Sequence, residues 1–280
     1  MKKQLFFLIL FIISSIISSI SYSLTPKIAV VPIGGVLTTN GESSLTGSSI
    51  SSREIASILN DATDDNSIKA VLIDINSPGG SPVASEEISR AIVSLKAEKP
   101  VYCLINDIGA SGAFWIAVSC DKVYASSMSI VGSIGVTSAG LGFENFIKDY
   151  NITYRRQTAG EFKDMGTPFR EMSEDEEQII QKLLDNIHNK FITHVANSRG
   201  MNRSTVVKLA TGEVFLGDEA KKIGFIDEIG YYPDVIEELK NITTKNAIVV
   251  DFGPEPTLAE LIGLNSLFKM PSAESQILLK

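Results

Sequence analysis

The sequence contains few of the residues that most often act as catalytic bases or metal ligands. Its 280 residues include two histidines, His188 and His194, and two cysteines, Cys103 and Cys120. It has no Cys-x-x-Cys pair and no cluster of histidine with cysteine, which argues against a zinc site. Both cysteines lie among apolar residues, where two packed thiols are the simpler interpretation and a disulfide is the alternative. Any nucleophile in this chain therefore has few imidazoles available as its base.

The sequence also lacks an excess of positive charge. It has 25 Lys and Arg against 33 Asp and Glu, a formal net charge of −8. The basic patch that is typical of nucleic-acid-binding proteins is therefore not expected. Hydrophobic residues make up 44% of the chain, which is enough for the core of one large domain or of two smaller ones.

The longest apolar run lies at the N-terminus. Two lysines precede residues 5–13, an apolar block of signal-peptide length, and small residues permit cleavage after Ser23. Read instead as one helix, residues 5–24 would be about 30 Å long, enough to cross a bilayer and remain as an anchor. Both interpretations leave the rest of the chain outside the cytoplasm, because the lysines stay inside. We therefore expect residues 1–24 to be a signal peptide or a membrane anchor.

Apolar strands alternate with helices in the first half of the chain, which predicts an α/β fold with a largely parallel sheet. A Gly-, Ser- and Thr-rich segment over 38–52 is expected to be a loop. Ser81 caps a helix that has a proline at its first position. The expected strands are 28–33, 70–75, 101–105 and 121–125, and the expected helices, beginning with one capped by Ser52, are 52–62, 82–98 and 111–119.

A second region begins near residue 132. Ser173 and Glu176 form a capping box that opens a long helix ending near Gly200. Both histidines fall inside this helix. Its apolar face indicates packing or a subunit contact and comprises Ile180, Leu183, Leu184, Ile187, Phe191 and Val195. Before it we expect a strand at 132–136, a helix at 143–150, a strand at 152–156 and a polar loop at 157–170.

Ser111 is the candidate nucleophile. It lies between the strand at 101–105 and an apolar helix, among small neighbours, where a hydroxyl and the amides that follow converge on one point. Serine needs a neighbouring base, and neither histidine lies on a loop that could supply one. The motif reads Gly-x-Ser-x-Ala, so the Gly-x-Ser-x-Gly elbow of the α/β-hydrolases is absent as well. The base is therefore expected to be another residue type.

Lys163 is the candidate base. A free lysine has a pKa near 10.4, so only about one molecule in 2,500 carries a neutral amine at pH 7. A general base needs a pKa of roughly 7–8, and burial beside Phe162, Met165 and Phe169 would lower the lysine pKa in that direction. Glu161 and Asp164 flank the lysine and would favour its ammonium form. The hypothesis therefore requires both acids to point away into solvent.

Residues 76–80, Asn-Ser-Pro-Gly-Gly, provide a third element. Two glycines just before a helix allow close backbone approach and leave free amides. Together with the amide of Gly112, these would hold the oxyanion of a tetrahedral intermediate. A tight strand-to-helix turn is the simpler interpretation. No Gly-Lys-Ser/Thr follows, which argues against a phosphate cradle.

Several blocks in a shared order, with Lys163 placed 52 positions after Ser111, resemble the signal peptide peptidase A (protease IV) family of serine-lysine peptidases in its short bacterial form. The resemblance covers about residues 27–235. The blocks are 28–33 with Gly35, 75–80, 110–112 with Phe114 and Trp115, 132–136, 162–164 with 168–170, and 217–220 with Gly224 and Asp227.

The resemblance implies a Clp protease/crotonase-like α/β core of repeated β-β-α units with a long helix. It implies a peptidase domain at 27–245 and a C-terminal extension at 246–280. Ser111 would be the nucleophile, Lys163 the general base and Ser133 the residue that orients the lysine, while Gly80 and Gly112 would form the oxyanion hole. The family forms homo-oligomeric rings in which the lysine completes a site with a neighbouring subunit's serine. It needs no cofactor, and its suggested substrates are signal peptides and other unfolded apolar segments.

Two positions depart from the family pattern. Asp74 stands where many members carry arginine, and Ala113 replaces a frequent glycine, which leaves the local charge and the substrate subsites open. A non-catalytic, ring-forming scaffold or peptide-binding protein of the same fold is the alternative. A crotonase-like acyl-thioester enzyme is a more distant one, disfavoured by the secretion segment because coenzyme A is cytoplasmic.

Overall fold

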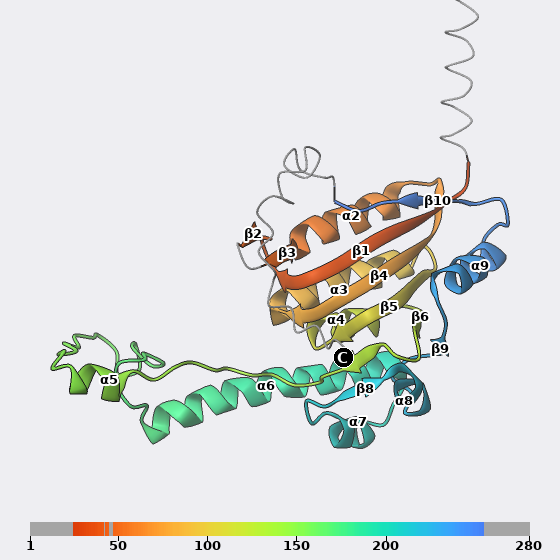
Figure 1. Cartoon of the computed structure of the whole chain (residues 1–280). Coiled ribbons are helices and arrows are strands. Elements are labelled where there is room, and N and C mark those ends of the chain that lie inside the picture. The colour runs from red at the N-terminus through yellow and green to blue at the C-terminus, as the bar shows by residue number, and fades with distance from the viewer. Residues whose placement is uncertain (1–24, 42, 45–46, 255–280) are drawn as a thin grey trace, which may run out of the picture. The chain divides into compact units, whose positions relative to one another are not determined.

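The computed structural model describes residues 25–254 apart from 42, 45 and 46 (Figure 1). The expected signal peptide or anchor at 1–24 and residues 255–280 lie outside the described residues. The chain divides into two compact units. We call the described residues of Met1–Ser133 and Glu213–Lys280 the sheet unit, and Ile134–Gly212 the helical unit.

The sheet unit is built on a mostly parallel sheet, as predicted. Along it the strands follow the order β2-β3-β1-β4-β5-β6-β9, with β10 beside β1 and β7 joined to both β5 and β8. The β2–β3 and β7–β8 pairs are antiparallel, and the other pairs are parallel. The strands are β1 (Lys27–Thr38), β2 (Ser43–Ser44), β3 (Gly47–Ser51), β4 (Ile68–Gly80), β5 (Val101–Ala110), β6 (Lys122–Ala125), β7 (Ile130–Gly132), β8 (Val214–Leu216), β9 (Glu228–Ile229) and β10 (Ile248–Asp251).

Helices cover both faces of this sheet, which explains why its central strands are apolar throughout. Helices α2 (Ser52–Asp64), α3 (Pro82–Lys96) and α4 (Gly112–Ala117) pack together on one face. Helix α9 (Tyr232–Ile242) covers the other, where its Val235, Ile236 and Leu239 join a buried cluster with residues of β1, β4, β5 and β6. The short helix α8 (Gly217–Lys222) follows β8.

Two boundaries near the first helix differ from expectation. Ser51, not Ser52, caps α2 by accepting a hydrogen bond from the amide of Glu54, and the Ser52 hydroxyl donates to Glu87 instead. The segment expected to be a loop contains β2 and β3. Strand β3 pairs in parallel with the last residues of β1. A serine-rich strand has little apolar alternation, so its pairing is decided by the neighbouring strands.

Strands β4 and β5 run well beyond their expected ends. The expected turn at 76–80 is instead the end of β4, which continues beside β1 and β5 through register shifts at Ile75/Ser77 and Gly34/Val36. Such bulges accommodate Pro and Gly in a strand while its pairing continues. Ser81 then caps α3 with Pro82 in its first turn, as predicted.

The helical unit contains α5 (Glu144–Asp149), α6 (Glu174–Arg199) and α7 (Arg203–Leu209). The Ser173/Glu176 capping box and the left-handed Gly200 at the end of α6 are confirmed. The strand expected at 152–156 is wrong, because these residues have no regular structure. The described part of this unit offers no strand to pair with them, and an unpaired strand leaves its amides unsatisfied. On the apolar face of α6, Val195 is fully buried but Leu183 is 58% exposed.

Cys103 and Cys120 form a disulfide, with their Cα atoms 5.9 Å apart, so the interpretation as two packed thiols is wrong. Cys103 lies on the face of β5 that α4 covers, and Cys120 follows that helix, so the tertiary fold brings them together. Strand β10 pairs with β1, so the sheet includes the first residues of the expected C-terminal extension. Among the described residues, no helix has both the length and the apolar character needed to span a bilayer.

Candidate functional site

Ser111 occupies a strained turn between β5 and α4. Its backbone has φ 52° and ψ −122°, an uncommon conformation for a residue with a side chain. Such conformations cost about 1–3 kcal/mol and cluster at active sites. The turn is held by the amide of Ser111, which donates to the carbonyl of Gly132 at 2.8 Å, and by the amide of Trp115, which donates to the carbonyl of Ser111 at 3.0 Å. This is the kind of strand-to-helix turn that presents a serine hydroxyl for attack.

Glycines allow the end of β4 to lie against this turn. A Cβ placed on Gly79 would lie 2.6 Å from the amide nitrogen of Gly112 and 2.9 Å from Cβ of Ser111. A Cβ placed on Gly112 would lie 3.3 Å from the amide nitrogen of Gly80. The structure therefore brings Gly80 and Gly112, the two candidate oxyanion residues, close together beside Ser111.

Two serines that we did not single out from the sequence support this packing. Ser77 is fully buried; its hydroxyl donates to the carbonyl of Gly35 at 2.6 Å and accepts from the amide of Gly79 at 3.1 Å. Ser85 donates to the carbonyl of Ser81 at 3.0 Å, and a Cβ placed on Gly112 would collide with the Ser85 hydroxyl oxygen. The position of Ser77 between Asn76 and Pro78 was the available sequence signal.

Ser133 lies at the neighbouring strand end. Strand β7 pairs with β5 so that Gly132 is opposite Ala110. Ser133 directly follows Gly132 in the sequence, and Ser111 directly follows Ala110. Ser133 also has a positive φ, 54°, and its amide donates to the carbonyl of Glu213 at 2.8 Å. Ser111, Ser133, Gly80 and Gly112 thus belong to one region of the sheet unit.

Lys163 belongs to the helical unit, in a series of turns after Gly160. Its amide donates to the carbonyl of Gly160 at 3.2 Å, and its side chain is exposed. Phe162 and Phe169, which were expected to bury the lysine, are 38% and 43% exposed. The expected apolar enclosure is therefore not formed by these residues within the helical unit.

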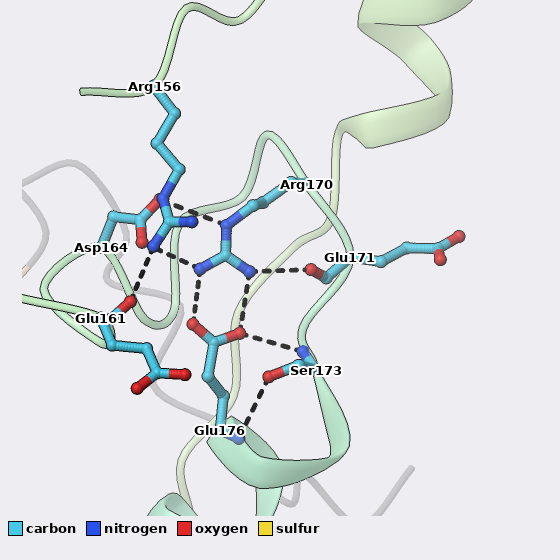
Figure 2. Close-up of polar contacts among 7 residues, drawn as sticks. All are labelled: Arg156, Glu161, Asp164, Arg170, Glu171, Ser173 and Glu176. Atoms are coloured by element: carbon cyan, nitrogen blue, oxygen red, sulfur yellow. Dashed lines mark hydrogen bonds and ion pairs between the residues drawn. The ribbon is translucent and has the colours of Figure 1, made fainter. Parts of the chain in front are cut away.

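Asp164 does not point into solvent as expected. Its carboxylate is held by Arg156, whose Nε is 2.8 Å away, and by Arg170, whose Nη2 is 2.9 Å away (Figure 2). Hydrogen bonds from Arg170 and then from Arg156 lower the pKa of Asp164 to about 2. The partners of this carboxylate are thus two guanidinium groups rather than water. Glu161 is exposed, and its backbone carbonyl accepts a hydrogen bond from Nη2 of Arg156 at 2.7 Å.

The other residues discussed from the sequence are the two histidines and Asp74. Both histidines fall in α6, and Nε2 of His188 is 3.2 Å from the carbonyl oxygen of Ile134. Asp74 is half-buried on β4, where desolvation raises its pKa against the opposing effect of a hydrogen bond from Asn106.

The chain matches a family model described as peptidase family S49 over residues 94–246. A protein of Methanocaldococcus jannaschii named "Putative protease MJ0651" is 34% identical over 204 residues, which cover 72% of this chain and 66% of that protein. A "Putative signal peptide peptidase SppA" of Enterococcus faecium is 32% identical over 216 residues, covering 76% and 63%. "Protease 4" of Haemophilus influenzae is 34% identical over 237 residues, covering 84% and 38%. The chain thus spans less than two thirds of the length of these relatives.

Proposed function

The chain belongs to peptidase family S49, and we propose that it is a serine endopeptidase with Ser111 as nucleophile and Lys163 as general base. The observation that carries this proposal is the strained conformation of Ser111 beside the paired glycines Gly80 and Gly112. A nucleophile on a rigid turn, with backbone amides next to it, can attack a carbonyl and stabilise the oxyanion that forms.

In the proposed reaction, the neutral amine of Lys163 takes the proton of the Ser111 hydroxyl as its oxygen attacks the scissile carbonyl. The ammonium then protonates the departing amine, leaving an acyl-enzyme. The neutral lysine next removes a proton from water, the hydroxide attacks the acyl carbon, and Ser111 regains its proton as the acid leaves. Ser133 would accept or donate a hydrogen bond that orients the lysine, and Gly80 and Gly112 would bind the oxyanion. No cofactor takes part.

The surroundings of Lys163 support assembly into a ring. A general-base lysine needs desolvation to lower its pKa, yet Lys163 is exposed and flanked by exposed phenylalanines. We propose that a neighbouring copy of the chain encloses it and that the lysine serves that copy's serine. The proposed protein is extracytoplasmic and associated with the membrane through its N-terminal segment. Its proposed substrates are signal peptides and other unfolded apolar peptides.

Cleavage of casein by the chain lacking residues 1–23 tests the dyad. Ser111→Ala and Lys163→Ala should each abolish cleavage, while Ser138→Ala and Lys148→Ala, which change exposed residues of the same types, should leave it unchanged. Lys163→Arg should also be inactive, since a guanidinium stays protonated. The wild-type rate should rise with pH as the lysine loses its proton. Equal cleavage by wild type and the Ser111 and Lys163 variants would refute the dyad, and no cleavage by wild type would favour the scaffold.

A further inference from the structure

The loop that carries Lys163 is attached to α6 by four charged residues, Arg156, Asp164, Arg170 and Glu176, which we call the Arg170 cluster (Figure 2). Arg170 uses every N–H group of its guanidinium. Nε and Nη2 donate to Asp164 at 3.2 and 2.9 Å, and Nη1 and Nη2 donate to Glu176 at 2.8 and 2.5 Å. Nη1 also donates to the carbonyl of Glu171 at 3.0 Å. A guanidinium has five such donors, so none is left over.

The cluster is anchored at the first turn of α6. The side chain of Glu176 is 3% exposed, and its carboxylate also accepts from the amide of Ser173 at 2.9 Å as part of the capping box. The side chain of Asp164 is 12% exposed. Arg170 makes a bidentate pair with each of the two carboxylates, and such pairs fix the orientation of the groups as well as the distance between them. Arg170 therefore joins the residue next to Lys163 to a fixed point on a long helix.

The cluster also balances charge. It contains two guanidiniums and two carboxylates, so Asp164 is neutralised where it follows Lys163 in the chain. The hydrogen bonds and ion pairs of the lysine loop link Glu161 and Asp164 on the loop with Arg156 before it, and Asp164 through Arg170 with Glu176 of α6. Of the two acids beside the lysine, Asp164 is thus the one whose availability depends on Arg170.

We propose that Arg170 is a positioning residue for Lys163, which holds the Asp164 carboxylate against α6 and so prevents it from pairing with the lysine ammonium. The inference deepens the proposed function and rests on it for its catalytic consequence. The inference also states that Arg170 controls how readily Lys163 loses its proton. That effect can be measured without any cleavage assay.

The experiment measures acetylation of Lys163 by acetic anhydride as a function of pH, with the modified peptide quantified by mass spectrometry. Only the neutral amine reacts, so the midpoint reports the protonation of Lys163. In Arg170→Gln the freed carboxylate should raise the midpoint by roughly 0.5–1 pH unit, as expected for a partly screened opposite charge. In Arg170→Gln/Asp164→Asn the midpoint should return to the wild-type value or below it.

Arg203→Gln is the matched control, since it removes an exposed arginine of the helical unit that donates to Asn189, away from the lysine loop. Its midpoint should equal that of wild type. If Arg170→Gln does not fold by circular dichroism, Arg156→Gln removes the more exposed guanidinium from Asp164 and should raise the midpoint in the same direction by less. An unchanged midpoint in the folded variant, or one raised equally when Asp164 is also replaced, would overturn the inference.

Cleavage kinetics keep this inference separate from the proposed function. If both hold, the rising limb of kcat/KM against pH moves with the acetylation midpoint, and activity at pH 7 falls about three- to tenfold in Arg170→Gln, because the neutral fraction falls tenfold per unit of pKa. A shifted midpoint in a protein whose Lys163→Ala variant cleaves as well as wild type would refute the dyad and leave the role of Arg170 standing. A cleavage loss in Arg170→Gln that is uniform with pH and not relieved by Asp164→Asn would mean that Arg170 merely supports the fold.

Discussion

Gly79→Ala is expected to disrupt the Ser111 turn, because the added methyl group would collide with backbone atoms of that turn. Gly79 has φ 97°, and its Cβ would lie 2.6 Å from the amide nitrogen of Gly112 and 2.7 Å from the carbonyl oxygen of Ala110. Both are backbone atoms, which cannot rotate away as a side chain can. The left-handed conformation costs about 1–2 kcal/mol with a side chain, and overpacking of a filled site costs about 1–3 kcal/mol.

The two effects together predict a loss of about 2–5 kcal/mol in the free energy of unfolding, from a total of about 5–15 kcal/mol for a typical protein. The change in the free energy of unfolding can be measured by urea unfolding, followed by the fluorescence of Trp115, the sole tryptophan, which lies in α4 close to Ser111 in the sequence. Relief of the collision requires the end of β4 and the turn at Ala110–Gly112 to move apart, which displaces Gly112 from Gly80. Loss of one oxyanion donor costs about 10²–10³ in kcat, so cleavage should fall by a similar factor in the protein that remains folded.

Two glycines serve as controls that separate strain from collision. Gly34 has an ordinary φ, and its Cβ would meet its nearest atom at 3.9 Å, so Gly34→Ala should change stability by less than about 0.5 kcal/mol. Gly212 has φ 87° and open space, so Gly212→Ala should show the conformational cost alone, about 1–2 kcal/mol. If Gly79→Ala is no less stable than Gly212→Ala, the argument that β4 lies in close contact with the Ser111 turn is refuted.

Two further predictions concern stability. The pKa of Asp164 is lowered from 3.8 to about 2 and that of Glu176 from 4.5 to about 2, so their contribution to folding is complete above about pH 4.5 and is lost as pH falls toward 2. Urea unfolding should therefore show a steeper loss of stability over that range in wild type than in Asp164→Asn/Glu176→Gln, and parallel curves would contradict the cluster. Reduction of the Cys103–Cys120 disulfide, which spans 17 residues of sequence, should lower the free energy of unfolding by about 3 kcal/mol. Cys103→Ala/Cys120→Ala should not respond to the reductant, and an unchanged wild type on reduction would argue against the bond.

Local chemistry made much of this fold predictable. Ser81 with Pro82, and Ser173 with Glu176, identified helix starts because capping depends on residues three or four positions apart. The buried strands were recognisable from their continuous apolar runs. Predictions failed where partners are distant in sequence. Residues 152–156 resemble a strand but have none beside them within the helical unit, and β3 is a strand because β1 lies next to it.

The candidate site divides in the same way. The sequence alone suggested Ser111 and the glycines at 80 and 112 as candidates, because small residues and a serine at a strand-to-helix junction are local features. It suggested Lys163 as a candidate because neither histidine is suitably placed to be the base. Only the tertiary structure decided that Gly79 must lack a side chain, that Cys103 meets Cys120, and that Arg170 takes up the acid beside Lys163. Each of these depends on the spatial arrangement of two or more segments, and the directions of a guanidinium, a thiol or a Cβ are set by the folded backbone rather than by residue order.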